Sequence, residues 1–345
     1  MTNPSLSVAI VGATGAVGAE MISCLERSRL PVRLQRLLAS ERSAGREMTF
    51  RGEPRLVEPL SYDSFSGVDI ALFSAGSAVS RLFAPVALEA GTVVIDNSSA
   101  FRMTETVPLV VPEVNSCALS YHWGLIANPN CVAIIASLVL APLHRAFGIR
   151  RIVASTYQAA SGAGAAAMRE LRDSTQAAIA GEPFTRKVLR HPYAFNLYSH
   201  DTTVDPASGS NEEEIKVARE LRKILNAPEL PIGVTCVRVP VLRAHAISLS
   251  VTLEQSATPD AARELLDSAS GVRVVDDVAN NHFPMPVEAT GVAEVLVGRI
   301  RRDAGDPSGH SLALFVCGDQ LLKGAALNAV QIAEHLFASA SSTRQ

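Results

Sequence analysis

Short apolar runs alternate with helix-spaced apolar positions along the first third of the chain. The runs have the length and the Val, Ile and Leu content of buried strands, at residues 7–11, 34–39, 69–74 and 92–96. Between them, apolar residues recur every three to four positions, as on one face of a helix, over residues 16–27 and 79–90. Strands that alternate with helices predict an α/β domain with a doubly wound, Rossmann-type parallel sheet.

After residue 131 the pattern becomes that of an α+β domain. A strand is expected near residues 151–157, and helices at about residues 131–146, 164–180 and 210–225. Further runs are expected to form neighbouring strands of a mixed sheet, at residues 233–241, 246–253, 292–301 and 311–317. In residues 246–253 large apolar residues alternate with Ser and Thr, so one face packs on a core. The other face is either solvated or a flat subunit contact.

The last strongly helical stretch, residues 320–337, is rich in Ala, Leu and Ile and poor in charge. Such a helix needs a partner surface, and we expect it to return to the first domain. This predicts a discontinuous first domain of residues 1–130 plus 320–345. The second domain is then residues 131–319.

Composition narrows the class of protein. The 345 residues exceed what one hydrophobic core usually organises. A net charge of −3, without basic runs, argues against nucleic acid or an anionic membrane and favours a small-molecule ligand. Five widely spaced cysteines predict neither a disulfide framework nor a metal site. The longest apolar stretch stops at Pro142, too short to span a bilayer, so we expect a soluble cytoplasmic protein.

A glycine-rich turn follows the first expected strand and opens the first helix. It reads Gly12-Ala-Thr-Gly-Ala-Val-Gly18. In this context the backbone N–H groups of a helix start accept a pyrophosphate, so the turn predicts a dinucleotide site. The alternative is a tight turn without a ligand.

The end of the second strand indicates which dinucleotide is bound. Where an NAD site usually has a lone acid, the chain has Arg42 and Ser43, which suit a 2′-phosphate. NADP is therefore favoured over NAD. Glu41 argues the other way, and Arg42 is alternatively an ordinary loop charge.

The segment Asn128-Pro-Asn130-Cys131 places a thiol where a long helix is expected to begin. The partial positive charge of a helix N-terminus favours the thiolate, which is the nucleophilic form of cysteine. Cys131 is thus a candidate nucleophile. The alternative is a small buried apolar residue.

Other polar residues follow expected strands. Arg102 is placed to clamp a phosphate, or is a surface arginine, and Gln158 is placed to orient a carbonyl, or is a turn residue. Arg238 and His245 meet between two strands, where a carboxylate-binding arginine and a general acid/base are plausible. The Glu212 to Lys216 stretch by itself resembles a solvated helix face.

Together these segments resemble the aspartate-semialdehyde dehydrogenase family from Val8 to Ala333. The matching pieces are GATGAVG, ASxRSAG, DNSSAFRM, NPNC, TYQAxSGAG, EExxK, RVPVxxxH, VGRIR and LLKGAALNAVQIAE. The resemblance implies a homodimer that uses NADP (NADPH) and inorganic phosphate. It also implies reduction of L-aspartyl 4-phosphate to aspartate semialdehyde in lysine, methionine, threonine and diaminopimelate biosynthesis.

The resemblance also implies roles for individual residues. Cys131 is the acyl-thioester nucleophile, His245 the acid/base that takes or returns a proton, and Asn130 or nearby N–H groups stabilise the oxyanion. The residues implied to bind substrate are Gln158, Arg238 and, at the amino group, Glu213, and those implied to bind phosphate are Arg102 and Lys216. The residues implied to line the NADP site are Gly12, Thr14, Gly15, Ala16, Val17, Arg42, Ser43, Ser161, Gly162 and Gln320.

The chain departs from the common family pattern at four positions. Val132 replaces a small hydroxyl residue, Ala244 a glycine, Ile215 a tryptophan and Gln320 an asparagine. None of these changes removes a charged participant, so they bear on turnover and cofactor preference more than on reaction type. The segment 191–210 also diverges, and its role is not assigned.

Two other functions compete with this interpretation. One is a sister acyl-phosphate reductase, such as N-acetylglutamyl-phosphate reductase, with the same thiol chemistry. The other is a catalytically retired paralogue that binds a dinucleotide without turnover. The motifs around Cys131 and Glu213 favour the aspartate branch, and retention of Cys131, Gln158, Arg238 and His245 argues against a retired protein.

Overall fold

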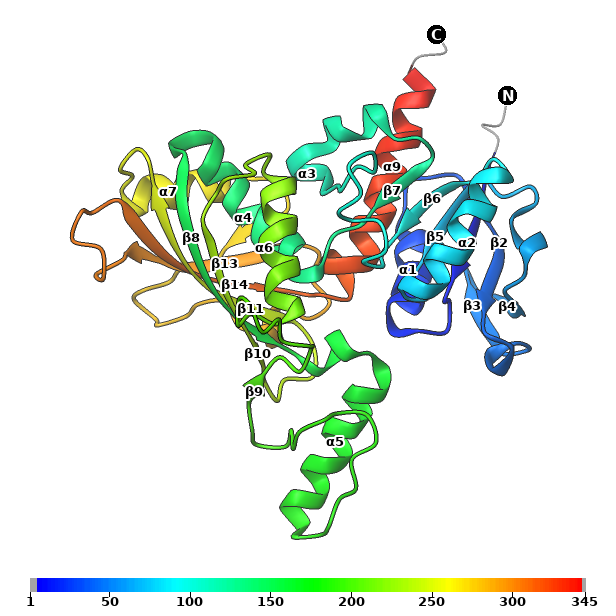
Figure 1. The fold of residues 1–345 in the computed structure, drawn as a ribbon, viewed down its shortest axis with the longest axis horizontal. Helices are drawn as coiled ribbons and strands as arrows, with labels where there is room; N and C mark the ends of the chain where they lie inside the picture. Colours follow the sequence, from blue (N-terminus) through cyan, green and yellow to red (C-terminus); the bar gives the residue numbers. More distant parts are fainter. Residues whose placement is uncertain (1–4, 343–345) are drawn as a thin grey trace. The chain divides into compact units, whose positions relative to one another are not determined.

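A computed structural model describes residues 5–342 of the chain. The described residues fall into two compact units (Figure 1). Unit 1 comprises the residues up to Asn130 together with those from Ala325 onward, and unit 2 comprises Cys131–Gly324. In the described part of the chain, no helix combines the length and apolar character needed to span a bilayer.

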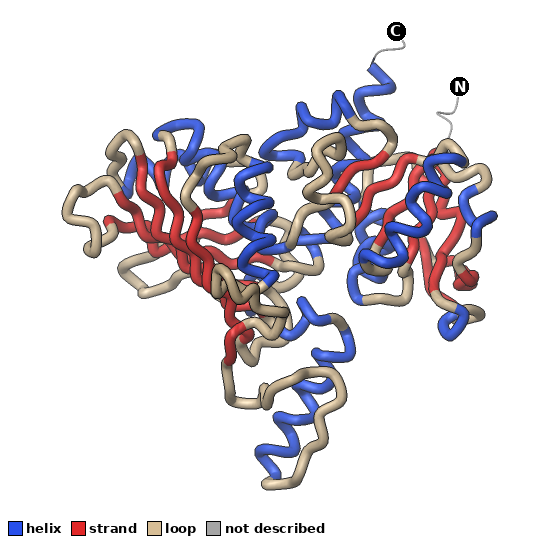
Figure 2. Tube along the Cα trace, in the orientation of Figure 1, coloured by secondary structure: helices blue, strands red, loops and turns tan. Residues whose placement is uncertain are grey.

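Unit 1 is built on a seven-stranded sheet with the order β3-β4-β2-β1-β5-β6-β7. The strands from β4 to β7 in that order run parallel, as predicted for a Rossmann-type sheet, and β3 pairs antiparallel with β4 at one edge. The strands of both sheets are red in Figure 2. The strands are β1 (Leu6–Val11), β2 (Val32–Ala39), β3 (Glu47–Phe50), β4 (Glu53–Pro59), β5 (Ile70–Phe73), β6 (Val93–Asp96) and β7 (Leu125–Ala127).

Three strands of unit 1 were not predicted. β3 and β4 carry charged, largely exposed residues, which hide the apolar alternation of a strand. β7 is buried but has only three residues. The four predicted strands and two predicted helices are present, the helices being α1 (Ala16–Arg27) and α2 (Ser77–Glu89). The short α3 (Pro112–Asn115) precedes a 3₁₀ turn, η3 (Ser116–Tyr121).

The C-terminal helix begins later than the sequence indicated. A π-helical turn, η5 (Leu322–Ala326), comes first, and α9 spans Leu327–Ser342, so Gln320 lies outside the helix. α9 contacts α1, α3 and β6, which is the surface that the sequence analysis expected it to meet. The break between the units falls after Gly324 rather than after residue 319.

Unit 2 contains a second seven-stranded sheet, with the order β12-β13-β14-β11-β8-β10-β9. β8 runs parallel to β10 and antiparallel to β11, so the sheet is mixed, as predicted. The strands are β8 (Ile149–Gln158), β9 (Tyr198–Ser199), β10 (Ile232–Arg238), β11 (His245–Leu253), β12 (Val272–Val274), β13 (Val295–Arg302) and β14 (Ser311–Gly318).

The predicted order of these strands was wrong in one respect. β10 is not a neighbour of β11, because β8 lies between them. Periodicity locates a strand but not its partners, and the crossover from β8 to β10, which contains α5 and α6, brings β10 back on the far side of β8. β9 and β12 have only two and three residues and give no periodic signal.

Helices cover one face of the unit 2 sheet. α4 (Cys131–Phe147) packs against β8, β11 and β14 and also contacts α6 (Glu212–Ile224) and α7 (Pro259–Asp267). On the opposite face, the side chains of β8 and β11 from Tyr157 and Ser248 to Arg151 and Thr252 are half-buried or exposed. The end of this face at Ala246 is covered, since Ala246 is buried in a cluster with Ala289 of the short helix α8 (Pro286–Ala289). α5 (Ala165–Ala180) and the loop after it extend beyond the β9 edge (Figure 1), and α8 contacts β14.

Candidate active site

The glycine turn of unit 1 is shaped for close approach to backbone. Gly12 has φ +88°, and a Cβ there would lie 2.5 Å from the carbonyl oxygen of Ser74. A Cβ on Gly18 would collide with the carbonyl oxygen of Gly12, so Gly18 lets α1 pack on the turn. α1 begins at Ala16, and its N-cap Gly15 offers no side-chain acceptor. The N–H groups of the first helical turn therefore lack an intrahelical partner and suit a pyrophosphate.

The loop after β2 carries Arg42, whose charged side chain is exposed. Arg42 lies in a 3₁₀ turn, η1 (Glu41–Ser43). It forms no hydrogen bond or ion pair with residues 5–342, although Glu41 is its neighbour. An arginine and Ser43 at the end of β2 fit the 2′-phosphate of NADP.

Arg102 is not a surface arginine. It is 8% exposed, and its Nε donates to the carbonyl oxygen of Asn128 at 3.0 Å while Nη2 donates to that of Asn97 at 2.6 Å. These bonds fix the guanidinium at the loops that follow β6 and β7. Asn130, 7% exposed, ends the same loop and precedes Cys131 directly. Arg102 and Asn130 thus both belong to unit 1.

Cys131 is the first residue of α4, as the sequence predicted, and its side chain is half-buried. The ten residues after it are all buried, so the helix is firmly seated and its N-terminus is held in place. A Cβ on Gly324 would lie 3.1 Å from the Cβ of Cys131. Glycine at position 324 therefore leaves room beside the thiol, and the helix N-terminus favours its anionic form.

Gln158 and Glu213 meet within unit 2. Gln158 ends β8, and its Nε2 donates to the Glu213 carboxylate at 3.1 Å, while its Oε1 accepts from the Thr156 hydroxyl at 3.2 Å. Both Gln158 and Glu213 are buried. The helix face that carries Glu213 is therefore not a solvated charge run. Gln158 Nε2 carries two N–H groups and gives one of them to Glu213, so it retains one N–H for a ligand.

Lys216 follows one turn later on α6. Its Nζ lies 3.6 Å from the Glu212 carboxylate, and both side chains remain partly exposed. Residues three apart on a helix share a face, so Lys216 lies on the Glu213 side of α6. An exposed i,i+4 pair of this kind holds its lysine only weakly, which leaves the ammonium free to take an anion.

Arg238 and His245 converge on the turn after β8. A Cβ on Gly162 would lie 3.0 Å from Arg238 Nη1 and 3.2 Å from His245 Nε2. Arg238 is paired in register with Gln158 on the parallel strand β8, and its Nη1 donates to the carbonyl oxygen of Ala159 at 3.3 Å. The structure thus brings together four of the residues predicted from sequence in unit 2: Gln158, Glu213, Arg238 and His245.

The proton on His245 is placed by a main-chain group. The Ala159 N–H donates to His245 Nδ1 at 3.0 Å. Because an amide N–H can only donate, Nδ1 is the acceptor, and the proton of the neutral ring is on Nε2. His245 is completely buried, and this burial, with the charge of Arg238 and then His200, holds its pKa well below 6.5. The ring is therefore neutral at pH 7 and presents Nε2–H as a donor.

Three enclosed donors in this part of unit 2 lack a partner among the described residues. They are Arg238 Nε, His245 Nε2 and the hydroxyl of Tyr198, which lies opposite Arg238 in the β9–β10 pair. Buried polar groups are nearly always hydrogen-bonded, so unsatisfied groups in one region indicate a missing partner. Since all three can donate, the partner is rich in acceptors, as a carboxylate or an oxyanion is.

Two departures from the family pattern meet in one hydrogen-bonded chain. Ala244 adopts φ +70°, a conformation that glycine takes freely and that costs an L-residue about 1–2 kcal/mol. Its N–H donates to Gln320 Oε1 at 2.9 Å, and Gln320 Nε2 donates to the Ser161 hydroxyl. Gln320 thus ties the turn before His245 to the turn after β8. Ser161, Gly162 and Gln320 are together, as expected of one site.

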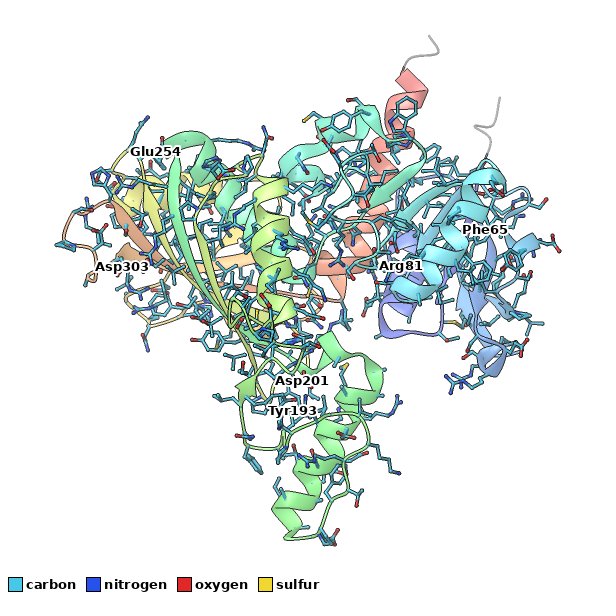
Figure 3. All side chains as sticks on the ribbon, in the orientation of Figure 1. Phe65, Arg81, Tyr193, Asp201, Glu254 and Asp303 are labelled. Carbon is cyan, nitrogen blue, oxygen red and sulfur yellow. The ribbon has the colours of Figure 1, made fainter. Side chains whose placement is uncertain are left out.

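Several further residues of this region come from segment 191–210, for which the sequence pattern indicated no role. Tyr193, labelled in Figure 3, donates its hydroxyl to the main-chain oxygens of Gln158 and Val239. Burial raises the pKa of this phenol, which stays neutral. His200 and Thr202, on either side of the labelled Asp201, lie between β9 and α6. Their signal in the sequence is only three polar residues in an irregular segment.

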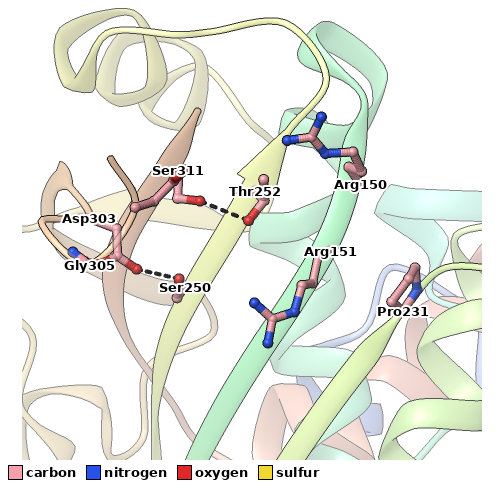
Figure 4. Close-up of a pocket in the computed structure, with 9 residues that line it drawn as sticks. Arg150, Arg151, Pro231, Ser250, Thr252, Asp303, Gly305 and Ser311 are labelled. Carbon is pink, nitrogen blue, oxygen red and sulfur yellow. Dashed lines mark hydrogen bonds between the residues drawn. The ribbon is translucent and has the colours of Figure 1, made fainter. Parts of the chain in front are cut away.

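A separate cavity of about 570 Å³ opens at the other end of β8 (Figure 4). Arg150 and Arg151 line it together with Asp303, which accepts a hydrogen bond from Ser250. It contains none of the residues predicted to bind substrate or cofactor. Among the described residues, no group of three or more His, Cys, Asp or Glu side chains is arranged to hold a metal ion.

Family comparisons agree with these two units. The model for "Semialdehyde dehydrogenase, NAD binding domain" matches residues 7–122, and that for "Semialdehyde dehydrogenase, dimerisation domain" matches residues 140–323. Fold and site together define a two-domain semialdehyde dehydrogenase, an oxidoreductase for which a nicotinamide dinucleotide is the indicated cofactor. More narrowly, the chain belongs to the aspartate-semialdehyde dehydrogenase family, which confirms the resemblance of its motifs.

Relatives resemble the chain over nearly its whole length. It is 49% identical over 334 residues to aspartate-semialdehyde dehydrogenase of Prochlorococcus marinus, covering 96% of each chain. It is 46% identical over 331 residues to the Synechocystis enzyme of that name, covering 96% and 97%. The crystal structure of aspartate semialdehyde dehydrogenase II from Vibrio cholerae complexed with ASA superposes with a TM-score of 0.94 at 40% identity, covering 97% of this chain and 99% of that one.

Proposed function

We propose that the protein is an NADP-dependent aspartate-semialdehyde dehydrogenase that reduces L-aspartyl 4-phosphate in amino-acid biosynthesis. The observation that carries the proposal is the position of Cys131 at the start of a buried helix. The same unit contains buried hydrogen-bond donors of Arg238 and His245 that have no acceptor among the described residues. A relative with this name is 49% identical to the chain.

Cys131 provides covalent catalysis in this proposal. Its thiolate attacks the aldehyde carbon, a C–S bond forms, and the carbonyl electron pair moves to oxygen. After oxidation the acyl group remains on the sulfur as a thioester. A phosphate oxygen then attacks that carbon, the C–S bond breaks, and the thiolate is regenerated, while the proton of the attacking phosphate passes to solvent. Reduction of the acyl phosphate follows the same steps in reverse.

His245 acts as a hydrogen-bond donor toward the oxyanion. With Nδ1 occupied by the Ala159 N–H, the free position is Nε2–H, which points the ring's donor toward the groups around Gly162. A donor fixed in place before reaction stabilises the charge that develops on the substrate oxygen. This modifies the acid/base role implied by the family resemblance, because thiolate attack and oxyanion collapse require no proton from the ring. Asn130 is proposed as a second group for the oxyanion.

The remaining residues bind the ends of the substrate. Arg238 takes the carboxylate in a planar, two-point contact, and Glu213 takes the amino group, with Gln158 fixing the Glu213 carboxylate. Arg102 and Lys216 bind the phosphate. The main-chain bonds of Arg102 orient its guanidinium before a ligand arrives, which reduces the entropy lost on binding.

Unit 1 is proposed as the NADP-binding domain. The residues that would hold the dinucleotide are the turn Gly12 to Val17, including Thr14 and Gly15, with Arg42 and Ser43 at the 2′-phosphate. From unit 2 we propose Ser161, Gly162 and Gln320. A nicotinamide ring, when bound, supplies the acceptor or donor of hydride at the substrate carbon.

Unit 2 is proposed as the catalytic and dimerisation domain, in line with the family model that matches it. The face of its sheet opposite α4 carries Val153 and Tyr157, which are 37% and 36% exposed. Tyr157 packs against Phe315 with a ring-centroid separation of 6.3 Å. The part of this face around Val153, Ser155 and Tyr157 is uncharged, with small and aromatic residues that suit a two-fold contact between identical chains.

The test is a phosphate-dependent assay with aspartate semialdehyde, run with NADP and NAD side by side. Reduced cofactor is expected to form only when phosphate is present, and faster with NADP. Rapid acid quenching without phosphate, followed by mass spectrometry, should show an aspartyl adduct on Cys131. Cys131→Ser is expected to abolish turnover while NADP still binds, since a hydroxyl is a far weaker nucleophile than a thiolate.

Three results would redirect the interpretation. Turnover of N-acetylglutamate semialdehyde in preference to aspartate semialdehyde would identify the sister reductase. NADP binding without any turnover would identify a retired paralogue. Substantial activity of Cys131→Ser would refute the thioester.

A further inference from the structure

His200 is a buried histidine in the segment that diverges from the family pattern. It is 7% exposed. The main-chain N–H of His200 donates to the carbonyl oxygen of Cys236 on β10 at 2.8 Å. The main-chain carbonyl oxygen of His200 accepts from Asn211 Nδ2 at 3.4 Å. The backbone alone therefore anchors this position between β10 and the start of α6. The imidazole is not needed for that anchoring.

The ring is oriented by a hydroxyl that is itself fixed by α6. His200 Nδ1 lies 3.3 Å from Thr202 Oγ1, and that oxygen accepts the Glu213 N–H at 3.3 Å. Thr202 keeps its hydroxyl proton and a second lone pair, so it pairs with either tautomer of the ring. In the tautomer that accepts the Thr202 proton at Nδ1, the ring proton of neutral His200 is on Nε2, an atom for which no hydrogen bond is found with the described residues.

The surroundings of His200 are the charged groups of the proposed substrate site. Arg238, Glu213, Asp201 and Lys216 act on it electrostatically, in that order, and burial is the largest influence. The net effect lowers its pKa below 6.5. Asp201 and Glu213 oppose the shift, so the neutral form results from burial and the two cations. His200 also acts on His245, which places the two rings in one electrostatic neighbourhood.

We propose that His200 is a substrate-binding residue, whose Nε2–H donates a hydrogen bond to the substrate carboxylate that Arg238 binds. The inference rests on the proposed function. Arg238 has an enclosed Nε without a partner among the described residues, so the site is built for more acceptor atoms than the protein supplies. A neutral donor beside the arginine adds direction to the contact without a second buried positive charge.

Two substitutions of His200 distinguish the effect of losing the hydrogen-bond donor from the effect of losing side-chain volume. His200→Leu keeps bulk but removes the donor, while His200→Gln places an amide N–H near the position of Nε2. We expect His200→Leu to raise KM for aspartate semialdehyde roughly 10- to 100-fold, the usual effect of losing a hydrogen bond to a charged group. His200→Gln should restore KM to within about threefold of the wild type. KM for phosphate and kcat should change little in either variant.

The control is His191→Leu, an exposed histidine of the same segment that packs edge-on against Tyr198. It reports disturbance of the segment without loss of the proposed donor, and its KM should match the wild type. Should His200→Leu fold poorly, Thr202→Val tests the same donor by releasing the ring, with a smaller rise in the same KM.

The outcomes distinguish this inference from the function on which it rests. A wild-type protein without turnover would end the proposed function and the inference together. Normal wild-type turnover would end the inference alone in three cases: an unchanged KM in His200→Leu, equal damage from Leu and Gln, or a rise in KM for phosphate in place of the aldehyde.

Discussion

A single backbone N–H sets the chemistry available to His245. Its donation from Ala159 to Nδ1 excludes a proton on that nitrogen, and burial disfavours a second proton on the ring. A histidine in a sequence is equally compatible with an acid, a base or a neutral donor. In this protein the hydrogen bond from Ala159 N–H to Nδ1 leaves the proton of the neutral ring on Nε2, so His245 is a neutral donor.

The pH profile tests this role. Since the pKa of His245 lies well below 6.5, kcat/KM should show no histidine ionisation near that value. His245→Gln, which retains an N–H donor but cannot shuttle a proton, should keep far more activity than His245→Ala. Loss of one oxyanion donor typically costs about 10²- to 10³-fold in kcat. Equal inactivity of Gln and Ala would instead indicate proton transfer.

Stability must be followed in the same pH range. A histidine that is neutral in the fold takes up a proton more easily when unfolded, so the unfolded state binds more protons below its ordinary pKa of 6.5. His245 and His200 therefore both cause stability to fall as the pH drops below that value. The pH profile of kcat/KM should therefore be interpreted only over the pH range in which the circular-dichroism spectrum shows that the protein stays folded.

At the scale of elements, the start of α6 links folding to substrate binding. Asn211 Oδ1 accepts the Glu214 N–H at 3.0 Å, and the Glu214 carboxylate accepts the Asn211 N–H at 2.9 Å, which forms a capping box. Glu214 also accepts the Cys236 N–H at 3.0 Å, which joins the helix to β10. Glu213 lies inside this first turn, so the cap determines where its carboxylate points.

Asn211→Ala should therefore have two effects. Loss of the cap is expected to lower the free energy of unfolding by about 1 kcal/mol, and the loosened turn should raise KM for aspartate semialdehyde. The matched control is Thr258→Ala, which removes the N-cap bond that the Ala261 N–H donates to Thr258 Oγ1 on α7, a helix without predicted site residues. Urea titration and steady-state kinetics measure the two effects. A similar KM change in both variants would contradict the assignment of Glu213.

At the scale of the whole molecule, the open sheet face of unit 2 predicts the oligomeric state. Tyr157 and Gln158 are neighbours in β8 but point to opposite faces, so the proposed subunit contact and the proposed substrate site lie on alternate residues of one strand. In a dimer, β8 would therefore contribute both to the subunit contact, through Tyr157, and to the substrate site, through Gln158.

Tyr157→Glu is expected to shift the protein from dimer to monomer, because burying an unpaired carboxylate in a flat contact is strongly unfavourable. Analytical ultracentrifugation at several concentrations measures the mass. Leu56→Glu, at an exposed apolar position on β4 of unit 1, serves as the control and should leave the mass unchanged. A Tyr157→Glu dimer as stable as the wild type would place the subunit contact elsewhere.

Local order was largely readable from sequence. The glycine turn, the helix that begins at Cys131 and the alternation in β11 follow from backbone geometry and apolar periodicity, which act between residues close in the chain. The short strands β7, β9 and β12 were not readable, because a few residues carry no period. The position of β10 beside β8 was missed because pairing is decided by the crossover, not by the strand itself.

By itself, the sequence determined the family, since the order of its motifs is specific. Only the tertiary structure decided the protonated nitrogen of His245, the hydrogen bond that Ala244 N–H donates to Gln320 and the burial of His200. Those features arise from contacts between residues 76 or more positions apart for the first two, and from packing between β10 and α6 for the third. Such contacts leave no local pattern, because each is made by side chains whose neighbours in the chain do not reveal what they meet in space.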